Sequence, residues 1–382
     1  MVELAQTTYQ GCNHQHLTEL LAEREGIHLS RSSVRRILGR AGLRSPRRRR
    51  PPKHRSRRER LPQAGMLLQV DGSRHRWLEE RGPWLTLVGA VDDATGEVPY
   101  ALFREQEDAA GYLLLLREVV RSRGIPLALY NDRHSIFQRR PDERETLEEQ
   151  LLGRREPTQV GRALEELGIQ SILARSPQAK GRVERLWGTF QDRLVTELRL
   201  ADACTLEEAN QVLWTFLPRF NARFSRPPEA SGSAYRPVNP GFDPDACFSF
   251  KYRRLVSNDN LVRLDGQVIS IPPGHPARSY ARALVEVQER LDGSLVVYYQ
   301  GRCIARQEPP SYTYVLSMWS RHVLRTAMPE PSTAYSCMAT SGMCSSFTLV
   351  VDLTSTRSKV PSVLRLRTST LNLTLSKVKA AS

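Results

Sequence analysis

The sequence contains no run of about 18 apolar residues, so we expect no helix that spans a bilayer. Its first residues, MVELAQTTYQ, lack the basic start and apolar segment of a secretory signal, which favours a reducing cytosol. The six cysteines form no CxxC pair and no Cys/His cluster at zinc spacing, so neither disulfides nor a structural zinc are expected. The GxxxxGKS/T, GxSxG and HExxH motifs are also absent, which excludes the ATP, serine-hydrolase and zinc-helix sites that they mark.

Positive charge is abundant and unevenly placed. The chain has 56 Lys and Arg against 41 Asp and Glu, a formal net charge of +15, so a polyanion is the first partner to suspect. Residues 44–60 carry ten of these basic side chains, one Glu and three prolines. Because like charges repel and proline interrupts helices, we interpret residues 44–62 as an extended linker. A solvated tail or a nuclear-type localisation signal would look similar. The linker side chains that we expect on nucleic acid are Arg47, Arg48, Arg49 and Arg50.

Residues 1–43 show the pattern of two short helices joined by a turn. Leu17, Leu20 and Leu21 share one helix face, a glycine then breaks the pattern, and Ser30 caps a second helix. This layout is typical of a helix-turn-helix DNA-binding region, here a truncated one, although any small amphipathic hairpin has the same pattern. The side chains of the second helix that we expect to contact DNA are Ser32, Ser33, Arg35, Arg36 and Arg40.

The region 63–235 alternates between strand and helix patterns, within a chain long enough for two or three domains. Three short apolar runs ending in turn residues come first, and amphipathic helices then alternate with further strands. This order predicts an α/β domain with a mixed sheet. The strands are expected at 66–72, 84–96, 99–103, 126–132 and 172–176, and the helices at 108–121, 157–168 and 181–200.

The remaining chain changes character twice. Residues 245–310 contain short strands with Asp-Gly turns at 265–266 and 292–293, which predicts a small five-stranded β-barrel. Such a barrel either contacts DNA through its basic strands or serves only in packing. Residues 331–382 hold 19 Ser and Thr in 52 positions and a single acid. We therefore expect residues 311–382 to be a disordered or aberrant tail without a function of its own.

Three acids follow these elements in an order that suggests one shared site. Asp71 and Asp132 each close an apolar strand, and Glu184 lies early on the helix 181–200. Ligands of open α/β sheets bind at the carboxyl ends of the strands, where these carboxylates can converge. Hard divalent cations prefer carboxylate ligands, and a pair of such ions supports phosphoryl transfer. Each acid also has a structural explanation: a turn at Asp71, an Asx turn at Asp132, and an ion pair of Glu184 with Lys180.

The segments around the second and third acids resemble two blocks of a known family. The NDRHSIF segment, residues 131–137, matches one block, and SPQAKGRVER, residues 176–185, matches the other. Over residues 10–306 the sequence resembles insertion-sequence transposases with a DDE integrase core, most closely the ISNCY type. The resemblance implies an RNase H-like core with a mixed five-stranded sheet, preceded by a helix-turn-helix and followed by a small SH3-like barrel. It also implies that Asp71, Asp132 and Glu184 form the catalytic, metal-binding triad.

The resemblance further implies DNA cleavage and joining by two successive phosphoryl transfers. The expected cofactors are two Mg²⁺ or Mn²⁺ ions, with no nucleotide. The expected partners are double-stranded DNA, at transposon ends and target, and further copies of the chain in a homodimer or larger assembly, with no membrane. Two alternatives stay open: a decayed DNA-binding protein or repressor, and an RNase H-type nuclease that cleaves without joining. The 51 residues between Asp132 and Glu184 predict a surface insertion around 137–156.

The helix expected at 181–200 gives further detail around the third acid. Lys180 and Arg182 are expected to remain free for DNA phosphates, and we assign Trp187 to the core rather than to base stacking. His75 and His134 lie close to the two aspartates, and His134 is the one that we expect to orient water or a phosphate. The apolar stripe of the helix consists of Val183, Leu186, Phe190 and Leu194.

Overall fold

The computed structural model describes residues 1–45, 59–132, 135–139, 147–153, 155–173, 181–274, 279–309, 347–351 and 362–366. Residues 1–320 form one unit and residues 321–382 a second. In the second unit the structure describes one antiparallel pair, β12 (Phe347–Val351) and β13 (Ser362–Leu366). The rest of the expected tail and the linker residues 47–50 lie outside the described residues. No described helix is both long and apolar enough to cross a membrane.

The N-terminal region contains α1 (Val2–Gln6), α2 (His14–Glu25) and α3 (Arg31–Arg40). Helix α2 ends at Gly26, whose φ of 65° is the left-handed conformation that glycine adopts readily. The Ser30 side chain accepts a hydrogen bond from the Ser33 backbone N–H, which confirms the predicted cap of α3. The predicted leucines are buried in one small core with residues of α3, namely Leu17, Leu20, Leu21, Val34 and Leu38.

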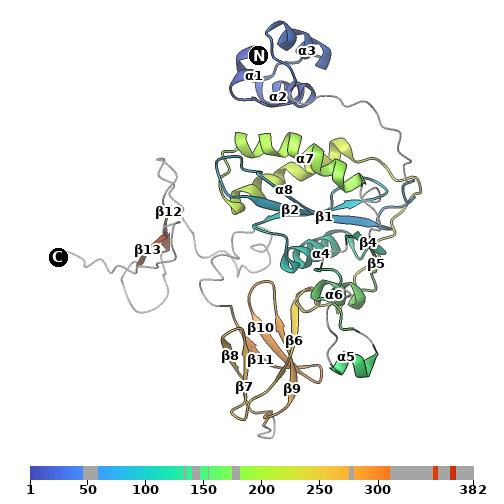
Figure 1. The fold of residues 1–382 in the computed structure, drawn as a ribbon, viewed down its shortest axis with the longest axis vertical. Coiled ribbons are helices and arrows are strands. Elements are labelled where there is room, and N and C mark those ends of the chain that lie inside the picture. Colours follow the sequence, from blue (N-terminus) through green and yellow to red (C-terminus); the bar gives the residue numbers. More distant parts are fainter. Residues whose placement is uncertain are drawn as a thin grey trace, which may run out of the picture. The chain divides into compact units, whose positions relative to one another are not determined.

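A mixed five-stranded sheet forms the centre of the chain, as predicted (Figure 1). Its strands follow the order β3-β2-β1-β4-β5. The first three strands along the chain pair antiparallel, whereas β1 with β4 and β4 with β5 pair parallel. The strands are β1 (Leu68–His75), β2 (Leu85–Asp92), β3 (Ala101–Arg104), β4 (Ala128–Asn131) and β5 (Gln170–Leu173).

Helices cover both faces of this sheet (Figure 1). On one face, α4 (Ala109–Arg123) and α6 (Gln159–Glu166) share an apolar core with β1, β2 and β4. On the other face, α7 (Gly181–Leu200) and α8 (Leu206–Phe224) share a core with β2 and β3. The alternation of strand side chains between the two faces explains why β2 is buried along its whole length.

Four of the described helices, the short α1 among them, were not expected from the sequence. Helix α5 (Leu147–Leu152) lies within the predicted surface insertion, and its Leu147 and Leu151 side chains are exposed. Helix α8 contains Pro218, which hid it from the sequence pattern. The Thr205 and Glu208 capping box at its start was a sequence signal from which this helix could have been predicted.

The region after the sheet domain contains six strands, one more than predicted. Four of them form a sheet of order β11-β10-β9-β6. Among the described residues, β7 and β8 form a separate two-stranded sheet, a hairpin that turns at Asp265-Gly266. Side chains from both groups share one apolar core. The elements are α9 (Pro244–Cys247), β6 (Phe250–Leu255), β7 (Leu261–Leu264), β8 (Gln267–Ser270), β9 (Leu284–Glu289), β10 (Leu295–Tyr299) and β11 (Arg302–Gln307).

Candidate active site

Asp71 lies inside strand β1 and not at its end, which corrects the sequence prediction. The strand continues to His75 because residues 72–75 pair with residues 85–88 of β2, so Asp71 and Gly72 do not form a turn. The half-buried Asp71 carboxylate faces the α7 side of the sheet, where Trp187 Nε1 donates a hydrogen bond to its Oδ2 at 3.0 Å. Asp71 is therefore held by the helix that carries the third predicted acid.

Asp132 directly follows β4, as predicted, and is half-buried. Strands β1 and β4 are parallel, with Gln69 opposite Tyr130. Continuing this register by two residues places Asp71 beside Asp132, on adjacent strands about 4.8 Å apart. The two carboxylates also share a face of the sheet, because each lies two residues beyond the paired position. The register therefore brings the two aspartates to adjacent strands, and a site that they share stays a prediction.

A buried phenol is affected by the charge of both aspartates. Tyr112 of α4 is 1% exposed, and its hydroxyl donates a hydrogen bond to Glu107 Oε1 at 2.5 Å. Burial raises the pKa of Tyr112 well above its usual value, and the negative charges of Glu107, Asp71 and Asp132 raise it further. Of these three acids, Glu107 is the one to which the Tyr112 hydroxyl donates a hydrogen bond.

Glu107 is a neighbour of the site that sequence reasoning missed. A Cβ atom placed on Gly72 would lie 2.6 Å from Glu107 Cδ, so the absence of a side chain at position 72 makes room for this carboxylate. Glu107 immediately precedes Asp108, whose side chain caps α4 by accepting from the Gly111 N–H. The Asp71-Gly72 pair was the available signal, since a glycine inside a strand often marks a close approach.

Helix α7 begins and ends at the residues that the sequence predicted. All four members of its predicted apolar stripe are buried. Glu184 lies in the first turn and is exposed, and Trp187 follows three residues later on the same side of the helix. Trp187 is buried, as predicted, and bonds Asp71, so it combines a core position with a contact to the candidate site.

Gly89 permits the approach of Trp187 to the sheet. It is the cross-strand partner of Asp71 on β2. A Cβ atom at this position would lie 2.9 Å from Trp187 Cη2 and 3.1 Å from Ala101 Cβ. The small residue next to Asp71 is therefore needed for the indole to reach the carboxylate.

Arg182 is not free, which corrects a second prediction. Its guanidinium forms an ion pair with Asp93, whose side chain is fully buried. Asp93 also accepts hydrogen bonds from Gln69 Nε2 at 2.8 Å and from the Leu61 N–H at 3.0 Å. Arg182 thus anchors the first turn of α7 to the sheet, two residues before Glu184, and its contact with DNA stays a prediction.

Other predicted site residues have different outcomes. Lys180 and His134 lie outside the described residues. The half-buried His75 packs edge-on against Trp77 with ring centres 5.3 Å apart, and burial lowers its pKa. Among the predicted DNA contacts of α3, the exposed ones are Ser32, Arg35, Arg36 and Arg40, whereas Ser33 is half-buried in the cap.

The predicted ligands are all carboxylates, which suits a hard divalent cation such as Mg²⁺. The charges of Asp71 and Asp132 both act on Tyr112, and Glu184 is exposed on the helix that binds Asp71. Among the residues that the structure describes, no three His, Cys, Asp or Glu side chains are arranged to hold a metal ion. A metal site on the two aspartates, and a triad with Glu184, stay predictions.

The sequence of this chain is similar to those of two transposases. The chain is 35% identical over 289 residues to the putative transposase y4bF of Sinorhizobium fredii (strain NBRC 101917 / NGR234), covering 75% of this chain and 61% of that protein. The chain is therefore similar to a transposase over three quarters of its length. The transposase for insertion sequence IS1202 of Streptococcus pneumoniae is likewise 35% identical, over 254 residues, covering 58% of this chain and 53% of that protein. The chain thus spans little more than half the length of the curated transposases that it matches. No family model matches it.

Solved integrase structures are among the structural neighbours of this chain. A simian T-cell lymphotropic virus intasome in complex with PP2A regulatory subunit B56 gamma is 14% identical, with 81% of this chain and 98% of that chain covered and a TM-score of 0.33. The dimeric HTLV-2 integrase catalytic core domain in complex with magnesium is 19% identical, with 40% and 86% covered and a TM-score of 0.28.

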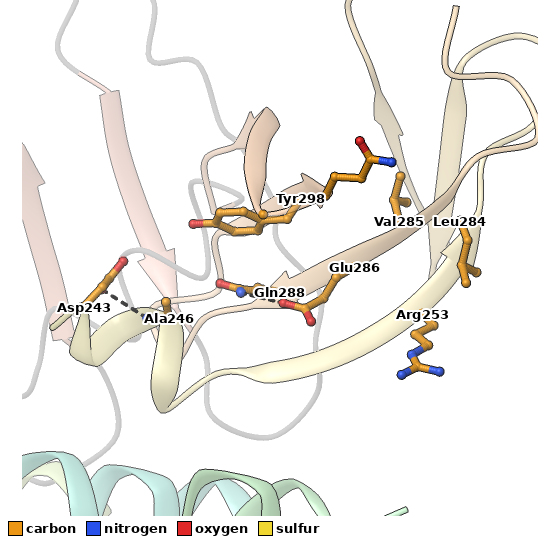
Figure 2. Close-up of a pocket in the computed structure, with 10 residues that line it drawn as sticks. Asp243, Ala246, Arg253, Leu284, Val285, Glu286, Gln288 and Tyr298 are labelled. Carbon is orange, nitrogen blue, oxygen red and sulfur yellow. Dashed lines mark hydrogen bonds between the residues drawn. The ribbon is translucent and has the colours of Figure 1, made fainter. Parts of the chain in front are cut away.

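A pocket of this chain lies in the β-rich region and not at the three predicted catalytic acids (Figure 2). It is lined by residues of α9, β6, β9 and β10, including Asp243, Arg253 and Glu286. Gln288 Nε2 donates a hydrogen bond to Glu286 Oε1 at 2.7 Å within it. Because neither predicted aspartate lines this pocket, we do not assign the candidate chemistry to it.

Proposed function

We propose that this chain catalyses metal-dependent cleavage and strand transfer at the ends of an insertion sequence, with Asp71, Asp132 and Glu184 as the catalytic carboxylates. The observation that carries the proposal is the position of Asp71, which lies in register with Asp132 and accepts a hydrogen bond from the helix that carries Glu184. The identity to named transposases supports the reaction class.

In this proposal the residues around the three carboxylates have distinct roles. Asp71 and Asp132 present negative charge on one face of the sheet, and Trp187 fixes the Asp71 carboxylate. The Arg182 and Asp93 ion pair secures the turn from which the exposed Glu184 extends to solvent. When two Mg²⁺ or Mn²⁺ ions are bound by the three carboxylates, they supply charge stabilisation at the attacking and leaving oxygens of the phosphodiester.

DNA binding in this proposal belongs to the basic parts of the chain. In this proposal the arginines of α3, which are exposed, contact the groove and phosphates, and the linker arginines follow the backbone of double-stranded DNA. Paired transposon ends require at least two copies of the chain, so a homodimer or larger assembly on DNA is part of the proposal.

The decisive experiment incubates the full chain with a pre-nicked transposon-end duplex and a plasmid target, with and without Mg²⁺. Magnesium-dependent joined product is the expected result. Cleavage without joining would indicate a nuclease of RNase H type. DNA binding with no product under either condition would indicate a decayed, repressor-like protein.

A further inference from the structure

The hairpin between β1 and β2 carries an exposed tryptophan beside two arginines. The Trp84 side chain is 51% exposed, and the guanidinium carbons of Arg74 and Arg76 each lie 5.8 Å from its ring centre. Both arginines are exposed as well. An exposed indole with cations at its side offers a flat ring and positive charge together, which suits a ligand with an aromatic face and a phosphate.

This hairpin is anchored, so the exposure of Trp84 is not that of a loose tip. Trp77, in the same connection, is fully buried, and its Nε1 donates a hydrogen bond to the Ser73 backbone oxygen at 3.0 Å. A Cβ atom at Gly82 would lie 2.4 Å from the Cys204 backbone oxygen, so this part of the connection packs against the start of α8. The surface around Trp84 is therefore held in place before any ligand binds, which lowers the entropic cost of binding.

The position of the hairpin determines which part of a bound ligand it can contact. Arg74 lies three residues beyond Asp71 on β1, about 10 Å along the strand at about 3.3 Å per residue, and its side chain points to the opposite face of the sheet from the Asp71 carboxylate. Arg76 pairs with the exposed Glu80 at 2.5 Å. Within the described part of the chain Arg74 forms no ion pair, so its charge is available to an anion.

We propose that Arg74, Arg76 and Trp84 form a platform for an unpaired nucleotide of the bound DNA, beyond the candidate active site along β1. This inference rests on the proposed function and names one contact that its substrate makes. The indole stacks on the base, and the arginines bind the flanking phosphates. The base is unpaired, because bases within a duplex already stack on one another and leave no free face for Trp84.

The test measures binding of the full chain to two labelled oligonucleotides, a duplex with a four-nucleotide single-stranded overhang and the same duplex with blunt ends. Trp84→Leu keeps an apolar side chain but removes the ring, and it is expected to weaken binding of the overhang probe about 5- to 150-fold and leave the blunt probe unchanged. Trp84→Phe retains a ring and is expected to keep most of the affinity. Leu255→Ala, which changes an exposed apolar residue elsewhere, is the control for Trp84→Leu. Arg121→Gln, which removes an exposed arginine elsewhere, is the control for Arg74→Gln.

Three outcomes are decisive. Loss confined to the overhang probe, with Trp84→Phe close to the unmodified chain, supports the platform. Unchanged binding by Trp84→Leu overturns it, and so does an equal loss on both probes. Asp71→Asn, measured beside these variants, separates this inference from the proposed function: it is expected to lose strand joining and keep the preference for the overhang. Joining that survives in Asp71→Asn counts against the proposed function, whatever the Trp84 variants show.

Discussion

The indole Nε1 of Trp187 donates a hydrogen bond to Oδ2 of Asp71 over 3.0 Å, and this bond joins α7 to β1. Glu184 lies one helical turn before Trp187, so the same bond relates the first and third predicted acids. A hydrogen bond to a carboxylate contributes about 1.5–3 kcal/mol in a partly buried setting. The indole therefore both fills the core and fixes the orientation of an acid, and the two roles can be separated by substitution.

Trp187→Phe keeps an aromatic ring in the core and removes the hydrogen bond to Asp71. Because the carboxylate then loses its donor, we expect strand joining to fall tenfold or more, with DNA binding unchanged. The matched control is Trp214→Phe, which removes a hydrogen bond of Trp214 Nε1 to the Ala101 backbone oxygen at 3.2 Å and leaves Asp71 untouched. Equal activities of the two variants in the joining assay would contradict a positioning role for Trp187.

Gly89→Ala is expected to displace the Trp187 ring, since the new Cβ would lie 2.9 Å from Cη2. Thermal melting should show a loss of stability of about 1–3 kcal/mol, and joining should fall with it. Gly241→Ala serves as control, because no atom lies within 4 Å of a Cβ at that position. A Gly89→Ala variant as stable and active as Gly241→Ala would show that the ring is free to move.

Glu208 is expected to make the stability of the fold depend on pH in a defined direction. Burial alone would raise the pKa of Glu208, but the N–H groups of Cys204 and Thr205 donate to its Oε2 at 2.9 and 3.1 Å and hold the pKa below its usual value of 4.5. A carboxyl whose pKa is lower in the folded chain stabilises the fold above its unfolded pKa, and this contribution is lost as the pH falls through the folded pKa.

Glu208→Gln should therefore lower the melting temperature at pH 7 and make a much smaller difference near pH 3. Melting curves of both proteins at pH 7, 5 and 3 measure this trend. Glu207→Gln, at the preceding position, controls for the loss of one charge in the first turn of α8. A difference between Glu208→Gln and the unmodified chain that is as large at pH 3 as at pH 7 would contradict the predicted direction.

The linker arginines are expected to make DNA affinity depend on salt concentration. If Arg47 to Arg50 each neutralise one DNA phosphate, the slope of log K against log salt concentration carries about 0.9 per contact. Replacing all four with Gln should reduce the magnitude of that slope by up to about 3.6 on double-stranded DNA. Fluorescence anisotropy over a range of salt concentrations gives the slope directly, and an unchanged slope would show that the linker does not contact phosphates.

Much of this arrangement was predictable from local sequence patterns. Helix α7 matched its prediction because its apolar residues recur at helical spacing, and Asp132 was placed correctly because β4 ends where the apolar run ends. Asp71 was misplaced because the end of β1 depends on pairing with β2, which no local pattern contains.

Contacts between distant segments explain the remaining differences. Arg182 looked free in the sequence because Asp93, its partner, is 89 residues away. Glu107 and Tyr112 were missed for the same reason, since only the folded sheet brings them to Asp71 and Asp132. The elements that carry the three predicted acids were thus largely predictable, whereas the contacts that those acids make with distant residues were not.

The most direct test of the central claim measures strand joining by Asp71→Asn, Asp132→Asn and Glu184→Gln separately, beside Asp259→Asn, which changes an exposed acid of the β-rich region. We expect each of the first three to lose joining by a hundredfold or more in Mg²⁺ while binding transposon-end DNA as the unmodified chain does, and Asp259→Asn to remain active. Full joining by any one of the three would contradict the shared carboxylate site.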